Sequence, residues 1–150
     1  RKDYKIKTIK NNKLYLMSKD DKLQIFDLPL NKLSTPILLV SAKGFDVLNN
    51  NLLFYNDFEL WTYSFDKGTK ELITRIGANI KKARWANDTN YIVYILENQI
   101  KIIEVDKRDK RQVIGLVKFG NIKNMMLTEK FNLYFIGEVN KASGLYKLEI

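Results

Sequence analysis

Short apolar runs separated by polar turns recur along the whole chain. Four segments share one ending, an apolar stretch that stops at an acidic residue: residues 23–27, 62–66, 102–106 and 145–149. The acids at positions 27, 66, 106 and 149 lie 39, 40 and 43 residues apart. This spacing predicts an internal repeat of about 40 residues.

Each repeat contains four stretches of strand length. Apolar runs precede the acid-terminated segments at residues 14–17, 52–55, 91–96 and 133–136. Short polar turns join the two, the longest at residues 138–144, and this arrangement predicts β-hairpins. Further apolar stretches follow the acid, at 36–40, 72–76 and 113–117, or begin the repeat, at 4–9, 45–48, 80–85 and 122–127.

The repeat length and strand count predict an all-β fold of β-propeller blades, each with four antiparallel strands. The chain contains about 3.75 such blades, with predicted limits at residues 1–40, 41–77, 78–117 and 118–150 of a single partial propeller. The second strand of each repeat is almost continuously apolar, which predicts a sheet covered on both faces. Pro36 falls in the fourth, outer strand, where a missing hydrogen-bond donor is tolerated.

The last repeat stops after its third strand. Closing a four-bladed ring would require residues 1–8 to supply a missing outer strand while they also form the first strand of the first repeat. About eight residues cannot span two strands and a turn. We therefore expect a fragment of a six- to eight-bladed propeller, with a closed four-bladed ring as the alternative.

Composition removes most catalytic chemistry. The chain has no Cys and no His, so disulfides, thiolate or histidine metal sites and Ser-His-Asp triads are excluded. We predict no catalytic, cofactor-binding or metal-binding residues, no cofactor and no enzyme activity in this segment. No apolar run approaches the roughly 20 residues that a membrane-spanning helix needs.

The net charge of +9 favours anionic partners such as nucleic acid, but solvated surface lysines are the simpler explanation. The turns between second and third strands carry acids that we interpret as solvated rather than as a cation site: Asp20, Asp21, Asp57, Glu97 and Glu138. The sequence therefore leaves a nucleic acid or another polyanion as a lesser possibility beside a protein partner.

Residues 83–94 resemble the Trp-Ser-Pro-Asp-Gly signature of TolB-like and related WD-repeat-like propellers of the PD40 type. Trp85 and Asp88 occupy the Trp and Asp places, while the Ser, Pro and Gly are absent. The resemblance implies a protein-binding module or an accessory domain, without a catalytic set. It also implies an extracytoplasmic location, although the sequence itself leaves the compartment unknown.

Seven residues form the candidate binding surface: Trp61, Arg84, Trp85, Lys107, Arg108, Lys110 and Arg111. The tryptophans and Arg84 fit either a binding surface or the packing between blades, because aromatic residues are enriched in both. The four cations within residues 107–111 fit either a phosphate-contacting patch or an ordinary solvated turn.

These observations lead to a non-enzymatic protein–protein interaction or scaffold module of a larger propeller. One alternative is an accessory propeller that gates a hydrolase or peptidase domain outside this segment. The other is a domain that binds an anionic polymer through its basic loops.

Overall fold

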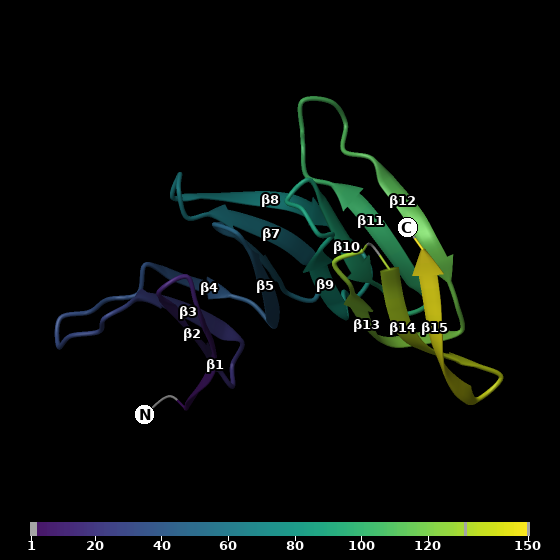
Figure 1. The fold of residues 1–150 in the computed structure, drawn as a ribbon, viewed down its shortest axis with the longest axis horizontal. Helices are drawn as coiled ribbons and strands as arrows, with labels where there is room; N and C mark the ends of the chain where they lie inside the picture. Colours follow the sequence, from purple (N-terminus) through teal and green to yellow (C-terminus); the bar gives the residue numbers. More distant parts are fainter. Residues whose placement is uncertain (1–2, 131, 150) are drawn as a thin grey trace. The chain divides into compact units, whose positions relative to one another are not determined.

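The computed structural model describes residues 3–130 and 132–149, which form the antiparallel strands β1 to β15 (Figure 1). Sheet 1 contains β1 (Tyr4–Lys10), β2 (Lys13–Ser18), β3 (Lys22–Asp27) and β4 (Leu38–Ser41). Sheet 2 contains β5 (Gly44–Leu48), β6 (Asn51–Tyr55), β7 (Glu59–Ser64) and β8 (Thr69–Arg75). Sheet 3 contains β9 (Lys82–Trp85), β10 (Tyr91–Ile95), β11 (Gln99–Glu104) and β12 (Val113–Lys118). Sheet 4 contains β13 (Asn121–Leu127), β14 (Asn132–Val139) and β15 (Ala142–Glu149).

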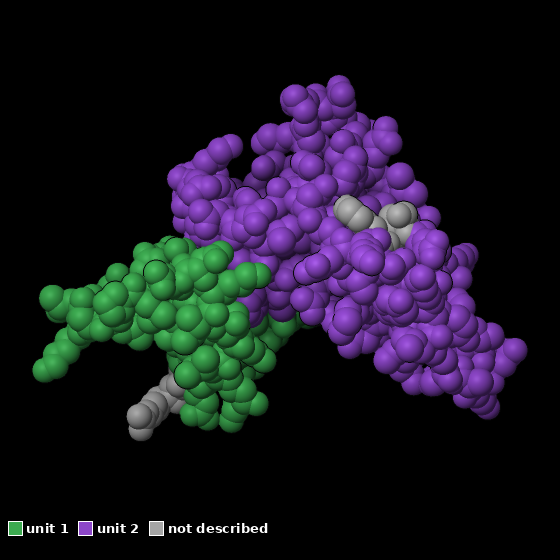
Figure 2. All heavy atoms as spheres, in the orientation of Figure 1, with its two compact units in different colours: residues 1–43 green, residues 44–150 purple. Residues whose placement is uncertain are grey.

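In every sheet, strands adjacent in sequence are adjacent in space, so each sheet is an antiparallel meander. The predicted all-β architecture of four-stranded propeller blades, with a last sheet of three strands, is confirmed. Residues 1–43 and residues 44–150 form two compact units, which Figure 2 shows in different colours. Unit 1 contains sheet 1, and unit 2 contains sheets 2, 3 and 4.

Two strand predictions need correction. Residues 138–144 do not form a long turn, because β14 and β15 pair without interruption from Asn132↔Glu149 to Val139↔Ala142. The turn is only Asn140 and Lys141, both with positive φ (50° and 65°), as a tight hairpin turn requires. Gly137 looks like a turn residue in the sequence, but it makes room for an aromatic ring: a Cβ there would lie 2.6 Å from Cδ1 of Phe119.

Pro36 lies before the fourth strand of sheet 1 rather than within it. Strand β4 begins at Leu38, and the backbone N–H of Ile37 donates to the carbonyl oxygen of Ile25 at 2.8 Å. The strand therefore starts after the proline, whose nitrogen has no hydrogen to donate.

Strand β10 confirms the prediction of a central strand buried on both faces. Four consecutive side chains of β10 are almost fully buried: Ile92, Val93, Tyr94 and Ile95. Ile92 and Tyr94 belong to an apolar cluster shared with sheet 2, whereas Val93 and Ile95 belong to a cluster shared with sheet 4. Sheet 3 is thus packed between its two neighbours within unit 2.

Polar contacts of the inner strands align these three sheets. Asp46 of β5 accepts a hydrogen bond at Oδ2 from the backbone N–H of Trp85 at 2.9 Å. One sheet further on, Asn87 donates through Nδ2 to the carbonyl oxygen of Thr128 at 2.7 Å. Each contact ties the end of one blade's first strand to the next blade.

Sheet 4 exposes an apolar face, whereas the equivalent faces of sheets 2 and 3 are buried. The three hairpins are aligned at the pairs Asn51↔Ser64, Tyr91↔Glu104 and Asn132↔Glu149. Counted back along the third strand from Ser64, Glu104 and Glu149, the fifth residues are Leu60, Ile100 and Leu145. Leu60 and Ile100 are 0% exposed, but Leu145 is 72% exposed. Its strand partner Ile136 is 42% exposed, whereas the equivalent Ile95 is fully buried. Sheet 4 therefore exposes the face that sheets 2 and 3 each bury against the sheet that follows them.

Candidate functional site

The seven predicted residues do not form one surface. Trp61 is half-buried on β7, where its ring stacks on Phe54 with centroids 6.2 Å apart and planes 7° apart. The ammonium of Lys70 lies 5.0 Å from the Trp61 ring centroid, a cation–π geometry. These contacts give the exposed part of Trp61 a fixed orientation.

Arg84 and Trp85 point to opposite faces of β9, as neighbours on a strand must. Trp85 departs from the predicted surface role, because its side chain is 4% exposed within the core between sheets 2 and 3. Arg84 remains exposed and pairs with Asp46 at 3.4 Å. The signature tryptophan thus serves packing, and only Arg84 of this pair lies on the surface.

Acidic residues outside the basic turn at residues 107–111 pair with three of its four cations. Lys107 pairs with Glu71 at 3.3 Å, and the guanidinium of Arg108 pairs with the carboxylate of Asp106. Hydrogen bonds from Arg108 hold the pKa of the Asp106 carboxyl below its usual value. Lys110 is exposed. Because its neighbours are paired, this turn gives little support to an anionic-polymer site.

Arg111 is a clamp between sheets 2 and 3. Its guanidinium donates to the carbonyl oxygens of Val105 (3.0 Å) and Ile73 (3.2 Å) and to Oε1 of Glu71 (2.6 Å). Ile73 lies in a register shift of the β7–β8 ladder, so its carbonyl is available to a side chain. Sequence reasoning missed Glu71 because its two cationic partners lie about one repeat away.

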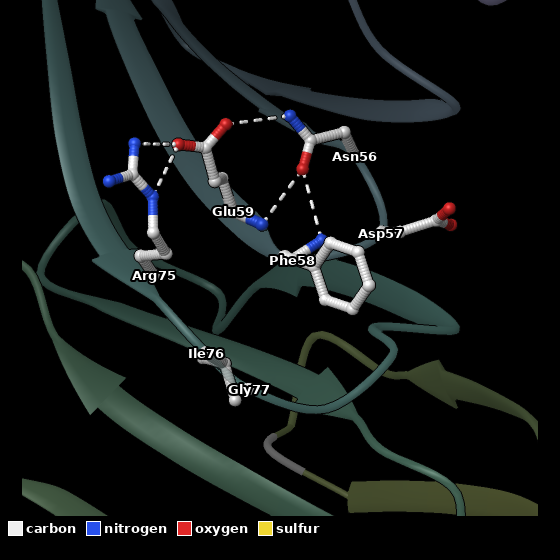
Figure 3. A pocket seen from close by; sticks show the side chains of 7 residues that line it. All are labelled: Asn56, Asp57, Phe58, Glu59, Arg75, Ile76 and Gly77. Carbon is white, nitrogen blue, oxygen red and sulfur yellow. Dashed lines mark hydrogen bonds and ion pairs between the residues drawn. The ribbon is translucent and has the colours of Figure 1, made fainter.

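Sequence reasoning also missed an open pocket of about 750 Å³ at one end of sheet 2 (Figure 3). The turn between β6 and β7 and the segment after β8 line it, with the residues Asn56, Asp57, Phe58, Glu59, Arg75, Ile76 and Gly77. Its volume is within the range of ligand pockets. The only signal in the sequence is the polar turn Asn56-Asp57 followed by an aromatic residue.

A hydrogen-bond network holds this pocket in shape (Figure 3). The side-chain oxygen of Asn56 accepts from the backbone N–H groups of Phe58 (3.0 Å) and Glu59 (2.9 Å), and its amide donates to Oε1 of Glu59 at 2.9 Å. Arg75 donates to Oε2 of Glu59 through Nε (3.0 Å) and Nη2 (2.6 Å). The hydrogen bonds from Asn56 and Arg75 lower the pKa of the Glu59 carboxyl.

The network leaves an aromatic side chain at the surface. The Phe58 ring is 50% exposed, while its carbonyl oxygen accepts from the N–H of Ile76 at 2.8 Å. The carbonyl of Asp57 likewise accepts from the N–H of Ile80 at 2.7 Å, so the turn is tied to the chain entering sheet 3. Phe58 therefore stands on a backbone fixed at several points.

The described residues contain neither a cluster of metal-ligating side chains nor a membrane-spanning helix. Within residues 3–130 and 132–149, no three acidic, His or Cys side chains gather as metal ligands. The same part of the chain has no helix that is long and apolar enough to cross a membrane.

Comparisons with known proteins identify the fold. No protein-family model matches the sequence, and no curated protein matches it. Hsv2 of Kluyveromyces lactis superposes with a TM-score of 0.65 at 13% identity, over 89% of this chain and 46% of that one. The N-terminal domain of Nup159 gives 0.63 at 10% identity, over 99% and 44%. BamB of Moraxella catarrhalis gives 0.60 at 16% identity, over 87% and 40%.

The chain thus spans less than half the length of each of these three solved structures. At such identities the similarity shows the fold and nothing finer. Together with the four sheets in sequence order, it shows that this chain has the architecture of a partial β-propeller.

Proposed function

We propose that the chain is a non-enzymatic protein-interaction module of a larger β-propeller and that a partner protein binds at the pocket around Phe58. The observation that carries the proposal is the half-exposed Phe58 ring on a hydrogen-bonded turn beside an open pocket. Aromatic side chains dominate the energetics of protein interfaces. A rigid turn also loses little conformational entropy on binding, which favours affinity.

The larger propeller is supported by the exposed face of sheet 4. Leu145 and Ile136 occupy positions that a following sheet buries in sheets 2 and 3. Partial coverage of the similar structures supports the same proposal. A TolB-like subfamily, and with it an accessory role beside a hydrolase domain, rests on the signature at residues 83–94 alone.

Proteins of similar fold support a protein partner. One similar structure is a complex of KlAtg21 with the coiled coil of AgAtg16, and another is BBS1N in complex with ARL6DN. We extend only the class of partner, a protein, to this chain.

Selection of binders from a random peptide display library tests the proposed site. Among the peptides that bind the wild-type chain, we expect a group whose affinity falls about 30-fold or more in Phe58→Ala, the loss typical of an interface hot spot. Tyr91→Ala is the matched control, since Tyr91 is an exposed aromatic residue of sheet 3 outside the pocket. If every selected peptide binds Phe58→Ala as tightly as the wild type, the Phe58 pocket is not the binding site.

A further inference from the structure

A second recess lies at the opposite end of sheet 2, between sheets 2 and 3. It has a volume of about 380 Å³. Sheet 2 contributes polar side chains from two neighbouring rows, one containing Thr62 and Glu71 and the other containing Asn51, Ser64 and Thr69. Trp85 and Val105 line it from sheet 3. We call this recess the polar cleft.

The repeat shows that this polarity is not needed for the fold. Thr62 pairs with Leu53 and Glu71, at the third position from the open end of the hairpin. At the equivalent position of sheet 3, Ile102 pairs with Val93 and Ile114. Ile102 packs into the apolar cluster that sheet 3 shares with sheet 4. The same place in the repeat is therefore apolar in one interface and polar and open in the other.

Trp85 supplies a hydrogen-bond donor without an acceptor. Its side chain lines the cleft and is 4% exposed, and its indole Nε1–H is buried with no hydrogen-bond partner. Buried donors are nearly always paired, so an orphan donor at a recess calls for an explanation. An acceptor group that enters the cleft would provide one once the lining side chains shift to expose the indole N–H.

The charges around the cleft are balanced. Glu71 already holds Lys107 and Arg111, and the other two charged residues of the lining, Asp66 and Lys67, carry opposite charges. The lining therefore selects neither a strong anion nor a strong cation. Its hydroxyl, amide and carboxylate groups offer donors and acceptors for a neutral polar ligand.

We propose that the polar cleft binds an extended peptide segment with small polar side chains such as Ser, Thr or Asn. Each peptide unit carries one acceptor and one donor. A peptide carbonyl pairs the Trp85 indole N–H, and peptide N–H groups donate to the hydroxyl and carboxylate oxygens of Thr62 and Glu71. This site is separate from the Phe58 pocket, so the two proposals stand or fall independently.

Tryptophan fluorescence gives a direct readout. The chain has two Trp residues, so Trp61→Phe leaves Trp85 as the only fluorescent indole. This variant is titrated with hexapeptides rich in Ser, Thr and Asn, and with hexapeptides rich in Leu and Ala. We expect a saturable change in Trp85 emission with the polar peptides and at least tenfold weaker binding of the apolar ones.

Thr62→Ile, in the same background, gives the cleft the residue type found at Ile102 and should weaken polar-peptide binding at least tenfold. Thr69→Val, in the more exposed row, should also weaken polar-peptide binding. It provides a second test in case Thr62→Ile perturbs folding. Thr74→Val is the matched control, because Thr74 lies on the same strand but does not line the cleft. Phe58→Ala should leave the titration unchanged.

Three outcomes overturn the proposal. The first is no saturable change with polar peptides up to millimolar concentration. The second is unchanged binding in both Thr62→Ile and Thr69→Val. The third is saturable binding of a neutral oligosaccharide panel without binding of the peptides, which would assign the cleft to a polyhydroxyl ligand.

Discussion

The two interfaces between the sheets of unit 2 each join successive sheets of the repeat, but they differ in chemistry. Between sheets 3 and 4, Val93, Ile95 and Ile100 pack on Leu133 and Phe135 in a continuous apolar cluster. Between sheets 2 and 3 an apolar cluster lies beside the polar cleft, and Arg111 joins two residues of the cleft lining, Glu71 and Val105. An interface of this repeat can therefore hold polar side chains at a position that is apolar in the neighbouring interface.

The largest change in stability is expected at Ile102, which is equivalent in the repeat to Thr62. Ile102→Ala removes packing from the interface of sheets 3 and 4 and should lower the free energy of unfolding by about 2 kcal/mol. Thr62→Ala, at the equivalent place beside the cleft, should cost less than about 1 kcal/mol because no tight packing is lost. Urea unfolding followed by tryptophan fluorescence measures both, since both tryptophans lie in unit 2. Equal losses would contradict the contrast between the interfaces.

An intermediate loss of stability is expected when the Arg111 clamp between sheets 2 and 3 is removed. Arg111→Met removes the hydrogen bonds to Val105, Ile73 and Glu71 and should lower the free energy of unfolding by about 1–2 kcal/mol. Arg108→Met is the control from the same turn, because Arg108 is exposed and pairs only locally with Asp106. Thermal unfolding should separate the two variants clearly, and a shift in Arg108→Met as large as that in Arg111→Met would remove the special role of Arg111.

The smallest change in stability is expected at Glu59, beside the Phe58 pocket, and it depends on pH. Glu59→Gln should destabilise unit 2 by less than about 1 kcal/mol at neutral pH, because the carboxylate accepts hydrogen bonds from Asn56 and Arg75. The pKa of Glu59 is lower in the folded chain, so its stabilisation is present above the unfolded pKa of the carboxyl. The stabilisation is lost as the pH falls through the lower, folded pKa.

The difference in unfolding free energy between wild type and Glu59→Gln should therefore shrink toward zero under acidic conditions. Urea titrations at a series of pH values measure it. A difference that stays constant as the pH falls would show that Glu59 acts through packing rather than through its charge.

Local patterns in the sequence predict the strands and the hairpins of this protein. The continuous apolar run of β10 predicts burial on both faces, and the polar Asn56-Asp57 turn marks the reversal between β6 and β7. The sequence predicts too long a turn around Asn140 and Lys141 because Gly137 and Gly144 break the apolar pattern. These glycines pair with each other within the ladder, and no local signal distinguishes that role from a turn.

The repeat, the strands and the absence of His and Cys follow from the sequence alone, because each depends on residue type or on spacing along a single strand. The tertiary structure alone decides that Trp85 is buried while Trp61 is half-exposed. It also decides that Arg111 pairs with Glu71 and that Phe58 lies exposed beside a pocket. The physical reason is that alternation along a strand tells which side chains share a face, whereas burial and pairing depend on what the neighbouring sheet, about 40 residues away, places against that face.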